Sequence, residues 1–81
     1  MARAAAINPE KIGPETPIRL HVAAALAFPD GSMTESGLRA EIRRGRLMVE
    51  RIAGKFYTTL ANIERMRAQC RVAPKDHASI Y

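Results

Sequence analysis

The sequence of 81 residues predicts a mainly α-helical domain with one small β-hairpin, in the order helix, turn, helix, hairpin, helix. Three observations support this fold class. Apolar residues recur at helical spacing in separate segments, breaks rich in Gly and Pro divide those segments, and a short run of strong β formers surrounds Gly54. A chain of this length has room for one domain at most.

The first periodic segment follows residues 1–17, in which prolines and a glycine interrupt any helical or strand pattern. We expect these residues to form a flexible N-terminal arm. Alanines then predict a first helix from about Arg19 to Ala27, because alanine is the best helix former. A Pro-Asp-Gly sequence at residues 29–31 ends this helix in a turn.

A second helix is expected after this turn, capped by either Ser32 or Thr34. Thr34 is the favoured cap, because it would place Met33 against Leu38 in a hydrophobic staple. The helix should end near Arg44, where the next residue is a glycine of the kind that terminates helices.

This second helix has one apolar face and one cationic face. On a helical wheel Ile42 lies beside Leu38, which defines the buried stripe. The opposite side carries Ser36, Arg39 and Arg43. Glu41 points elsewhere on the wheel, so we expect nothing within the chain to neutralise the cationic face.

The segments at residues 47–52 and 56–58 predict two short strands joined by a tight connection at Ala53-Gly54-Lys55. Either Thr58 or Thr59 is expected to cap a third helix. Its apolar face would contain Leu60, Ile63, Met66 or Arg67, and Cys70. Residues 72–81 have no pattern and are expected to form a tail, which leaves residues 18–71 as the folded domain.

The charge distribution indicates a polyanionic partner. The formal net charge is +5, and the segment from Gly37 to Lys55 holds six cations and two anions. Nucleic acid and an anionic membrane surface both fit such a patch. The chain has few aromatic residues and no long amphipathic basic helix, so we expect no membrane partner.

The sequence contains no arrangement typical of catalysis, a metal site or a cofactor. His21 and His77 are far apart and have no cysteine or carboxylate cluster at ligand spacing. The single cysteine, Cys70, is expected to fill the core, and no serine or threonine lies beside a general base. We therefore expect a cytoplasmic protein that is not an enzyme and takes no small-molecule substrate.

The cationic helix face suits double-stranded DNA, because an α-helix enters the major groove and arginine pairs with guanine or phosphate. Residues early in the helix would reach base edges, and later ones would hold phosphates. In the hairpin, the basic residues are expected to contact DNA, while Phe56 only packs on the core. The residues assigned to DNA binding are Thr34, Glu35, Ser36, Arg39, Arg43, Arg44, Arg46, Arg51, Lys55 and Tyr57.

Together these motifs resemble the small winged helix-turn-helix proteins of the excisionase type, which are related to the DNA-binding part of the mercury-resistance regulators. The shared features are Ala-Ala at residues 23–24, IRRGRL at residues 42–47 and RIAGKFY at residues 51–57. The resemblance covers about Ile18 to Met66.

The chain also departs from that family at three places. Arg19 stands where a Thr or Ser usually caps the first helix, and Gly37 stands where the second helix often has Thr. The Pro-Asp-Gly turn is longer than usual in the family.

The resemblance implies DNA binding without catalysis. Excisionases bind near the attachment site of a phage or mobile element, often side by side, bend the DNA and help the integrase to excise the element. Double-stranded DNA is then the implied partner, with an integrase or a second copy of the chain beside it. A small transcriptional regulator and a DNA-binding subunit of a phage terminase are alternatives from related proteins. A protein-interaction adaptor with a basic face is the alternative from a different class, and a merely solvated basic face is the alternative without a partner.

Overall fold

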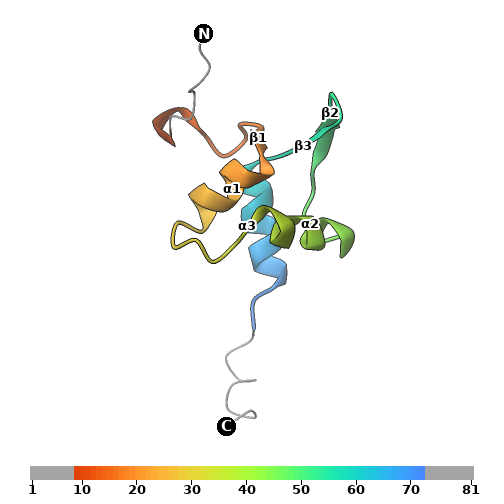
Figure 1. Ribbon diagram of the computed structural model, residues 1–81. Helices are drawn as coiled ribbons and strands as arrows, with labels where there is room; N and C mark the ends of the chain where they lie inside the picture. Colours follow the sequence, from red (N-terminus) through yellow and green to blue (C-terminus); the bar gives the residue numbers. More distant parts are fainter. Residues whose placement is uncertain (1–8, 73–81) are drawn as a thin grey trace.

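The computed structural model describes residues 9–72, which form a small mixed α/β domain of three α-helices and a three-stranded antiparallel sheet (Figure 1). The predicted features at residues 1–8 and 73–81, His77 among them, lie outside the described residues. The elements are a short 3-10 helix (Pro9–Lys11), β1 (Ile18–Arg19), α1 (Leu20–Ala27), α2 (Glu35–Arg43), β2 (Glu50–Ile52), β3 (Lys55–Thr58) and α3 (Leu60–Gln69).

The core lies where α1 contacts α2, α3 and β3. Its buried apolar side chains are Ile18, Leu20, Val22, Ala23, Ala24, Leu38, Leu47, Ile63 and Met66. The alanines of α1 let the neighbouring elements approach closely, because a methyl side chain takes little room. Three helices and a few long apolar side chains therefore suffice to close the core of a chain this short.

The strand β1 is an element that the sequence analysis did not predict. Ile18 and Arg19 pair with Thr58 and Tyr57 of β3, so the strand order is β1-β3-β2 rather than a two-stranded hairpin. The expectation that a helix starts at Arg19 is corrected by one residue. Arg19 is the extended N-cap of α1, and its side chain makes no capping hydrogen bond.

Residues 12–17 also differ from the expected flexible arm. Ile12 packs against the core, and the backbone N–H of Ala61 donates to the carbonyl of Pro14 at 2.9 Å. The hydroxyl of Thr16 accepts from the backbone N–H of Gly13 at 2.9 Å. The folded part of the chain therefore begins before Ile18, because this segment is tied to the start of α3.

Both ends of α2 agree with the prediction. The hydroxyl of Thr34 accepts from the backbone N–H of Gly37 at 3.1 Å, and Met33 packs against the core as a hydrophobic staple requires. At the other end, Gly45 has a φ of 78°, and the N–H of Arg46 donates to the carbonyl of Glu41 at 3.0 Å. This hydrogen bond is part of a Schellman motif, and glycine is the preferred residue at its left-handed position.

The strands β2 and β3 are joined by the two-residue turn Ala53-Gly54, with Ile52 paired to Lys55. Both turn residues have positive φ values, 53° and 76°, as a type I′ turn requires. For alanine this left-handed conformation costs about 1 kcal/mol. Strand pairing starts at Glu50 rather than at residue 47 as predicted.

That shorter strand has a local cause in residues 47–48. The side chain of Leu47 is buried in the core. The carbonyl of Met48 accepts from the hydroxyl of Thr58 at 2.9 Å and from the amide of Asn62 at 3.3 Å. Because side chains of β3 and α3 use this carbonyl, the chain is held away from the sheet until Glu50.

The third helix begins at Leu60 with Thr59 as its cap, which settles the two threonine alternatives. Ile63 and Met66 are buried as expected. The prediction that Cys70 fills the core is wrong: its side chain is exposed. The helix ends at Gln69, so Cys70 lies beyond the last helical residue and no longer shares the apolar face of α3.

Candidate nucleic-acid interface

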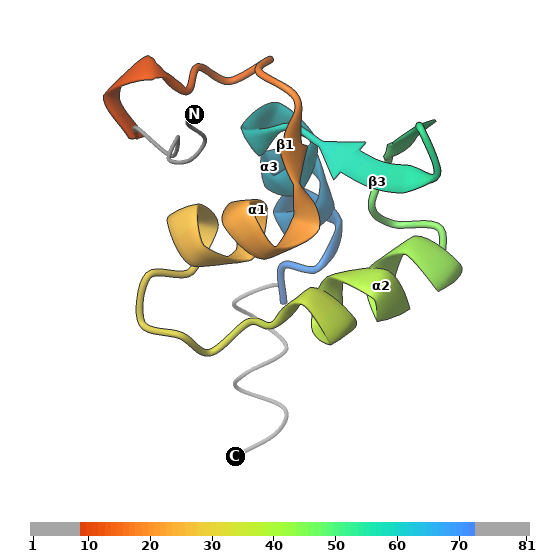
Figure 2. The same cartoon turned by 45° about the horizontal axis from the view of Figure 1, so that its top comes forward.

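The exposed face of α2 carries the side chains that the sequence assigned to it. Leu38 is fully buried and Ile42 is half-buried, whereas Ser36, Arg39 and Arg43 are exposed. Figure 2 shows α2 on the outside of the domain, on the same side as the β2–β3 hairpin. The helix and the hairpin therefore form one continuous side of the molecule.

The expectation that nothing neutralises the cations of this helix is wrong in part. Arg39 forms an ion pair with Glu35 at 2.9 Å, and these side chains are 45% and 39% exposed. Glu41 accepts from Arg44 at 3.0 Å and from Arg46 at 2.6 Å. As the helical wheel predicts, Glu41 does not pair with Arg39. The chain turns after α2, however, and this turn brings the side chain of Arg46 back to the Glu41 carboxylate.

Three cations on this side have no ion pair within residues 9–72: Arg43, Arg51 and Lys55. All three side chains are exposed. Arg39 adds a fourth cation, because an exposed ion pair on a helix surface contributes little and is readily exchanged for another anion. The cations available to an external anion thus come from both α2 and the hairpin.

A single aromatic ring joins these two elements. The guanidinium of Arg39, from α2, lies 5.4 Å from the centre of the Phe56 ring, and the guanidinium of Arg51, from β2, lies 5.1 Å from it. Arg51 and Phe56 are cross-strand partners, so they share one face of the sheet. Two cations from two different elements are therefore held near each other by the attraction between guanidinium groups and an aromatic face.

Tyr57 lies on the other face of the sheet, because neighbouring strand residues alternate. Its ring contacts Arg19, whose guanidinium is 5.9 Å from the ring centre, and its strand partners are Arg19 and Glu50. The structure therefore separates Tyr57 from the cluster that Arg39 and Arg51 form around Phe56.

The remaining residues predicted to bind DNA differ in whether their side chains already have a partner within the protein. Thr34 uses its hydroxyl to cap α2, and Arg46 is held by Glu41. Arg44 shares that carboxylate but is exposed. The sequence analysis missed Phe56 as a positioning residue and did not consider Arg19 for this surface. The signal was present at Phe56, since an aromatic residue opposite an arginine in a hairpin is a stacking pair.

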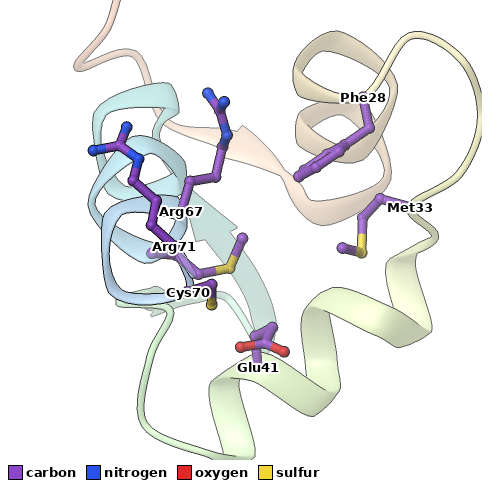
Figure 3. Close-up of a pocket in the computed structure, with 7 residues that line it drawn as sticks. Phe28, Met33, Glu41, Arg67, Cys70 and Arg71 are labelled. Atoms are coloured by element: carbon purple, nitrogen blue, oxygen red, sulfur yellow. The ribbon is translucent and has the colours of Figure 1, made fainter. Parts of the chain in front are cut away.

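Glu41 also lines a hollow of about 280 Å³ between the turn after α1, α2 and the end of α3 (Figure 3). The hydrogen bond from Arg46 lowers the pKa of Glu41 below its ordinary value, against the raising effect of burial. The apolar part of the wall comes from Phe28, Met33 and Met66. The carboxylate therefore favours its charged form and is the ion-pair partner of Arg44 and Arg46.

Residues 9–72 contain no group of three or more His, Cys, Asp or Glu side chains that could hold a metal ion. In the same residues, every helix is too short or too polar to cross a bilayer.

The chain matches no family model, no curated protein and no solved structure.

Proposed function

We propose that this chain is a winged helix-turn-helix protein that binds double-stranded DNA without catalysing a reaction. In this proposal α2 enters the major groove, and the β2–β3 hairpin is the wing that touches the adjacent backbone or minor groove. The observation that carries the proposal is the Phe56 ring, which holds Arg39 of α2 and Arg51 of β2 within 5.4 and 5.1 Å of its centre.

This arrangement is difficult to explain as a device for stability. Two guanidinium groups that share one ring repel each other, and within residues 9–72 only Glu35 forms an ion pair with either of them. A phosphate or the edge of a guanine would satisfy both charge and geometry, because arginine presents a planar fork of donors. Arg43 extends the same charge along the helix, and Lys55 adds a cation at the tip of the wing, on the face of the sheet opposite Arg51 and Phe56.

In this proposal, the position of each residue on α2 or the hairpin decides whether it contacts bases or phosphates. Arg39 lies in the first half of α2 and would reach base edges in the major groove, whereas Arg43 would hold a phosphate. Arg51 and Lys55 would hold phosphates from the wing. Ser36, exposed near the start of α2, would lie beside the bases.

Within this class, the resemblance to excisionases supports a role in excision of a phage or mobile element in the cytoplasm. A transcriptional regulator and a DNA-binding terminase subunit use the same surface. The neighbouring genes distinguish the roles: an adjacent integrase gene supports excision, and an adjacent gene for a terminase large subunit supports packaging.

The proposal is tested by fluorescence anisotropy with a labelled duplex of about 20–30 base pairs at several salt concentrations. If Arg43, Arg51 and Lys55 each neutralise one phosphate, the slope of log affinity against log salt is about −2.7, since each phosphate contributes about −0.9. A slope near zero contradicts the proposal. Capture of an acidic protein together with no affinity for duplex DNA would instead assign the basic face to an adaptor.

A further inference from the structure

We propose that Ile52, at the tip of the wing, is a wedge that enters the minor groove and separates two neighbouring base pairs, so that the protein kinks the DNA it binds. This inference rests on the proposed function and names a second way in which the wing acts. It concerns an apolar side chain, whereas the DNA contacts assigned above are polar or cationic.

The position of Ile52 is unusual for its chemistry. It is 48% exposed, although it is a large aliphatic residue. It lies on β2, which is an outer strand in the order β1-β3-β2, so no further strand of the described sheet covers it. An exposed aliphatic residue on an edge strand favours unwanted pairing with other chains, and proteins usually place charged residues there instead.

The surroundings of Ile52 match a groove of DNA. Its chain neighbour Arg51 and its strand partner Lys55 are exposed cations without an ion pair in the described part of the chain. The tip consists of Ala53 and Gly54, which carry a methyl group and no side chain. The whole ribbon is too wide for a minor groove about 6 Å wide, but a tip this slim lets the Ile52 side chain approach a groove that opens as the duplex kinks.

Other exposed apolar side chains do not share this setting. In residues 9–72 the large ones are Met48, which is 71% exposed, and Val72, which is 60% exposed. Met48 precedes β2 and lies beside Asn62 of α3, and Val72 follows α3. Of the three, Ile52 is the one at the cationic tip, where aliphatic side chains are known to enter base steps and unstack them.

A simpler explanation is that isoleucine is present only as a good β former. Two variants separate the explanations, because valine and threonine have nearly the same shape and both are β-branched. Ile52→Val keeps an apolar tip, whereas Ile52→Thr places a hydroxyl there. Both variants retain the β preference and all the cations.

The experiment uses the full chain and a duplex of about 30 base pairs that contains TA steps, which kink readily. A donor and an acceptor dye at the two ends report bending. 2-Aminopurine beside a TA step reports unstacking, because its fluorescence rises when it loses a neighbour. Anisotropy with the same duplex gives the affinity and its salt slope.

We expect the wild-type protein and Ile52→Val to raise energy transfer and 2-aminopurine fluorescence, and Ile52→Thr to lose most of both signals. The salt slope of Ile52→Thr should remain that of the wild type, because no phosphate contact is removed. The wedge is overturned if Ile52→Thr bends and unstacks the duplex as Ile52→Val does, or if the wild-type protein binds with a clear salt slope and gives neither signal. Binding without any salt slope overturns the proposed function as well, so the two failures are distinguishable.

Discussion

The arginines of α3 and those of α2 with the hairpin differ in what surrounds them, although both segments carry more cations than anions. At the end of α3, Glu64 accepts from Arg67 at 2.7 Å and from Arg71 at 2.9 Å. Arg65 donates to the side chain of Asn62 at 2.6 Å. The acceptors of these cations, Asn62 and Glu64, both lie on α3.

The side formed by α2 and the hairpin also has carboxylate acceptors, Glu35 and Glu41, but they pair with only some of its cations. Arg43, Arg51 and Lys55 lack ion pairs within residues 9–72, and Phe56 gathers two guanidinium groups from different elements. The comparison teaches that a count of cations does not locate a docking surface. What matters is whether carboxylates lie within reach and whether the cations from separate elements converge.

The largest effect is expected for Arg39→Ala, which removes the cation nearest the start of α2. If this residue makes a bidentate contact with a base, the loss is about 1–3 kcal/mol at the preferred base pair, and sequence preference flattens. Competition with duplexes that differ at single base pairs measures both quantities. Arg39→Lys is the matched control, because it keeps the charge but not the fork and should lose preference while retaining the salt slope. Unchanged affinity and preference in Arg39→Ala would show that α2 is not the recognition helix.

A smaller effect is expected for Arg43→Ala, measured against the same change at Arg67. Arg43 should hold one phosphate, so its loss should weaken binding to all sequences and reduce the salt slope by about 1. Arg67 lies on α3, outside the side formed by α2 and the hairpin, so its removal should leave the slope unchanged. Equal slopes for the two variants would erase the distinction between the two arginine-rich segments.

Phe56→Leu tests whether the ring positions Arg39 and Arg51 or only fills space. Each exposed contact between a guanidinium and a ring is worth about 0.5–1 kcal/mol, and this bounds what the ring contributes by holding each arginine in place, so we expect a loss of DNA affinity of up to about that size. Phe56→Tyr keeps the ring and should bind as the wild type does. Thermal unfolding of both variants checks that the domain stays folded. If Leu and Tyr bind DNA equally well, the original interpretation of Phe56 as a packing residue is sufficient.

The smallest effect is expected for Glu41→Gln, which tests the carboxylate that holds Arg46. Because Arg46 lowers the pKa of Glu41 in the folded state, this interaction stabilises the protein above the unfolded pKa of the carboxyl group. That stabilisation is lost as the pH falls through the lowered folded pKa. Chemical denaturation should therefore show Glu41→Gln to be less stable than the wild type at pH 7, with the difference vanishing in acid. A difference that stays constant with pH would mean that shape rather than charge matters at this position.

The sequence predicted those features that depend on neighbours within a few residues. Thr34 and Gly45 set the ends of α2, because a cap and a left-handed terminator act on the adjacent turn. The apolar stripe of Leu38 and the exposed arginines opposite it follow from the helical period alone. The hairpin around Gly54 was also recognised, since its turn residues are local signals.

Features that join distant residues were missed or misjudged for a common reason. Residues 18–19 form β1 because β3 offers them partners about forty positions later, and no local pattern records that pairing. Glu41 and Arg46 are only five residues apart, but they meet across the Schellman turn, which a helical wheel does not describe. Phe56 lies near two arginines because α1 contacts both α2 and β3.

What the sequence determined by itself is thus the set of helices, the caps and the surplus of positive charge, since these depend on residue type and short-range spacing. Only the tertiary structure decided which cations remain without an ion pair in the described residues and which ones meet at one ring. The physical reason is that pairing of charges depends on distances of a few ångströms between side chains, and the path of the folded backbone sets those distances.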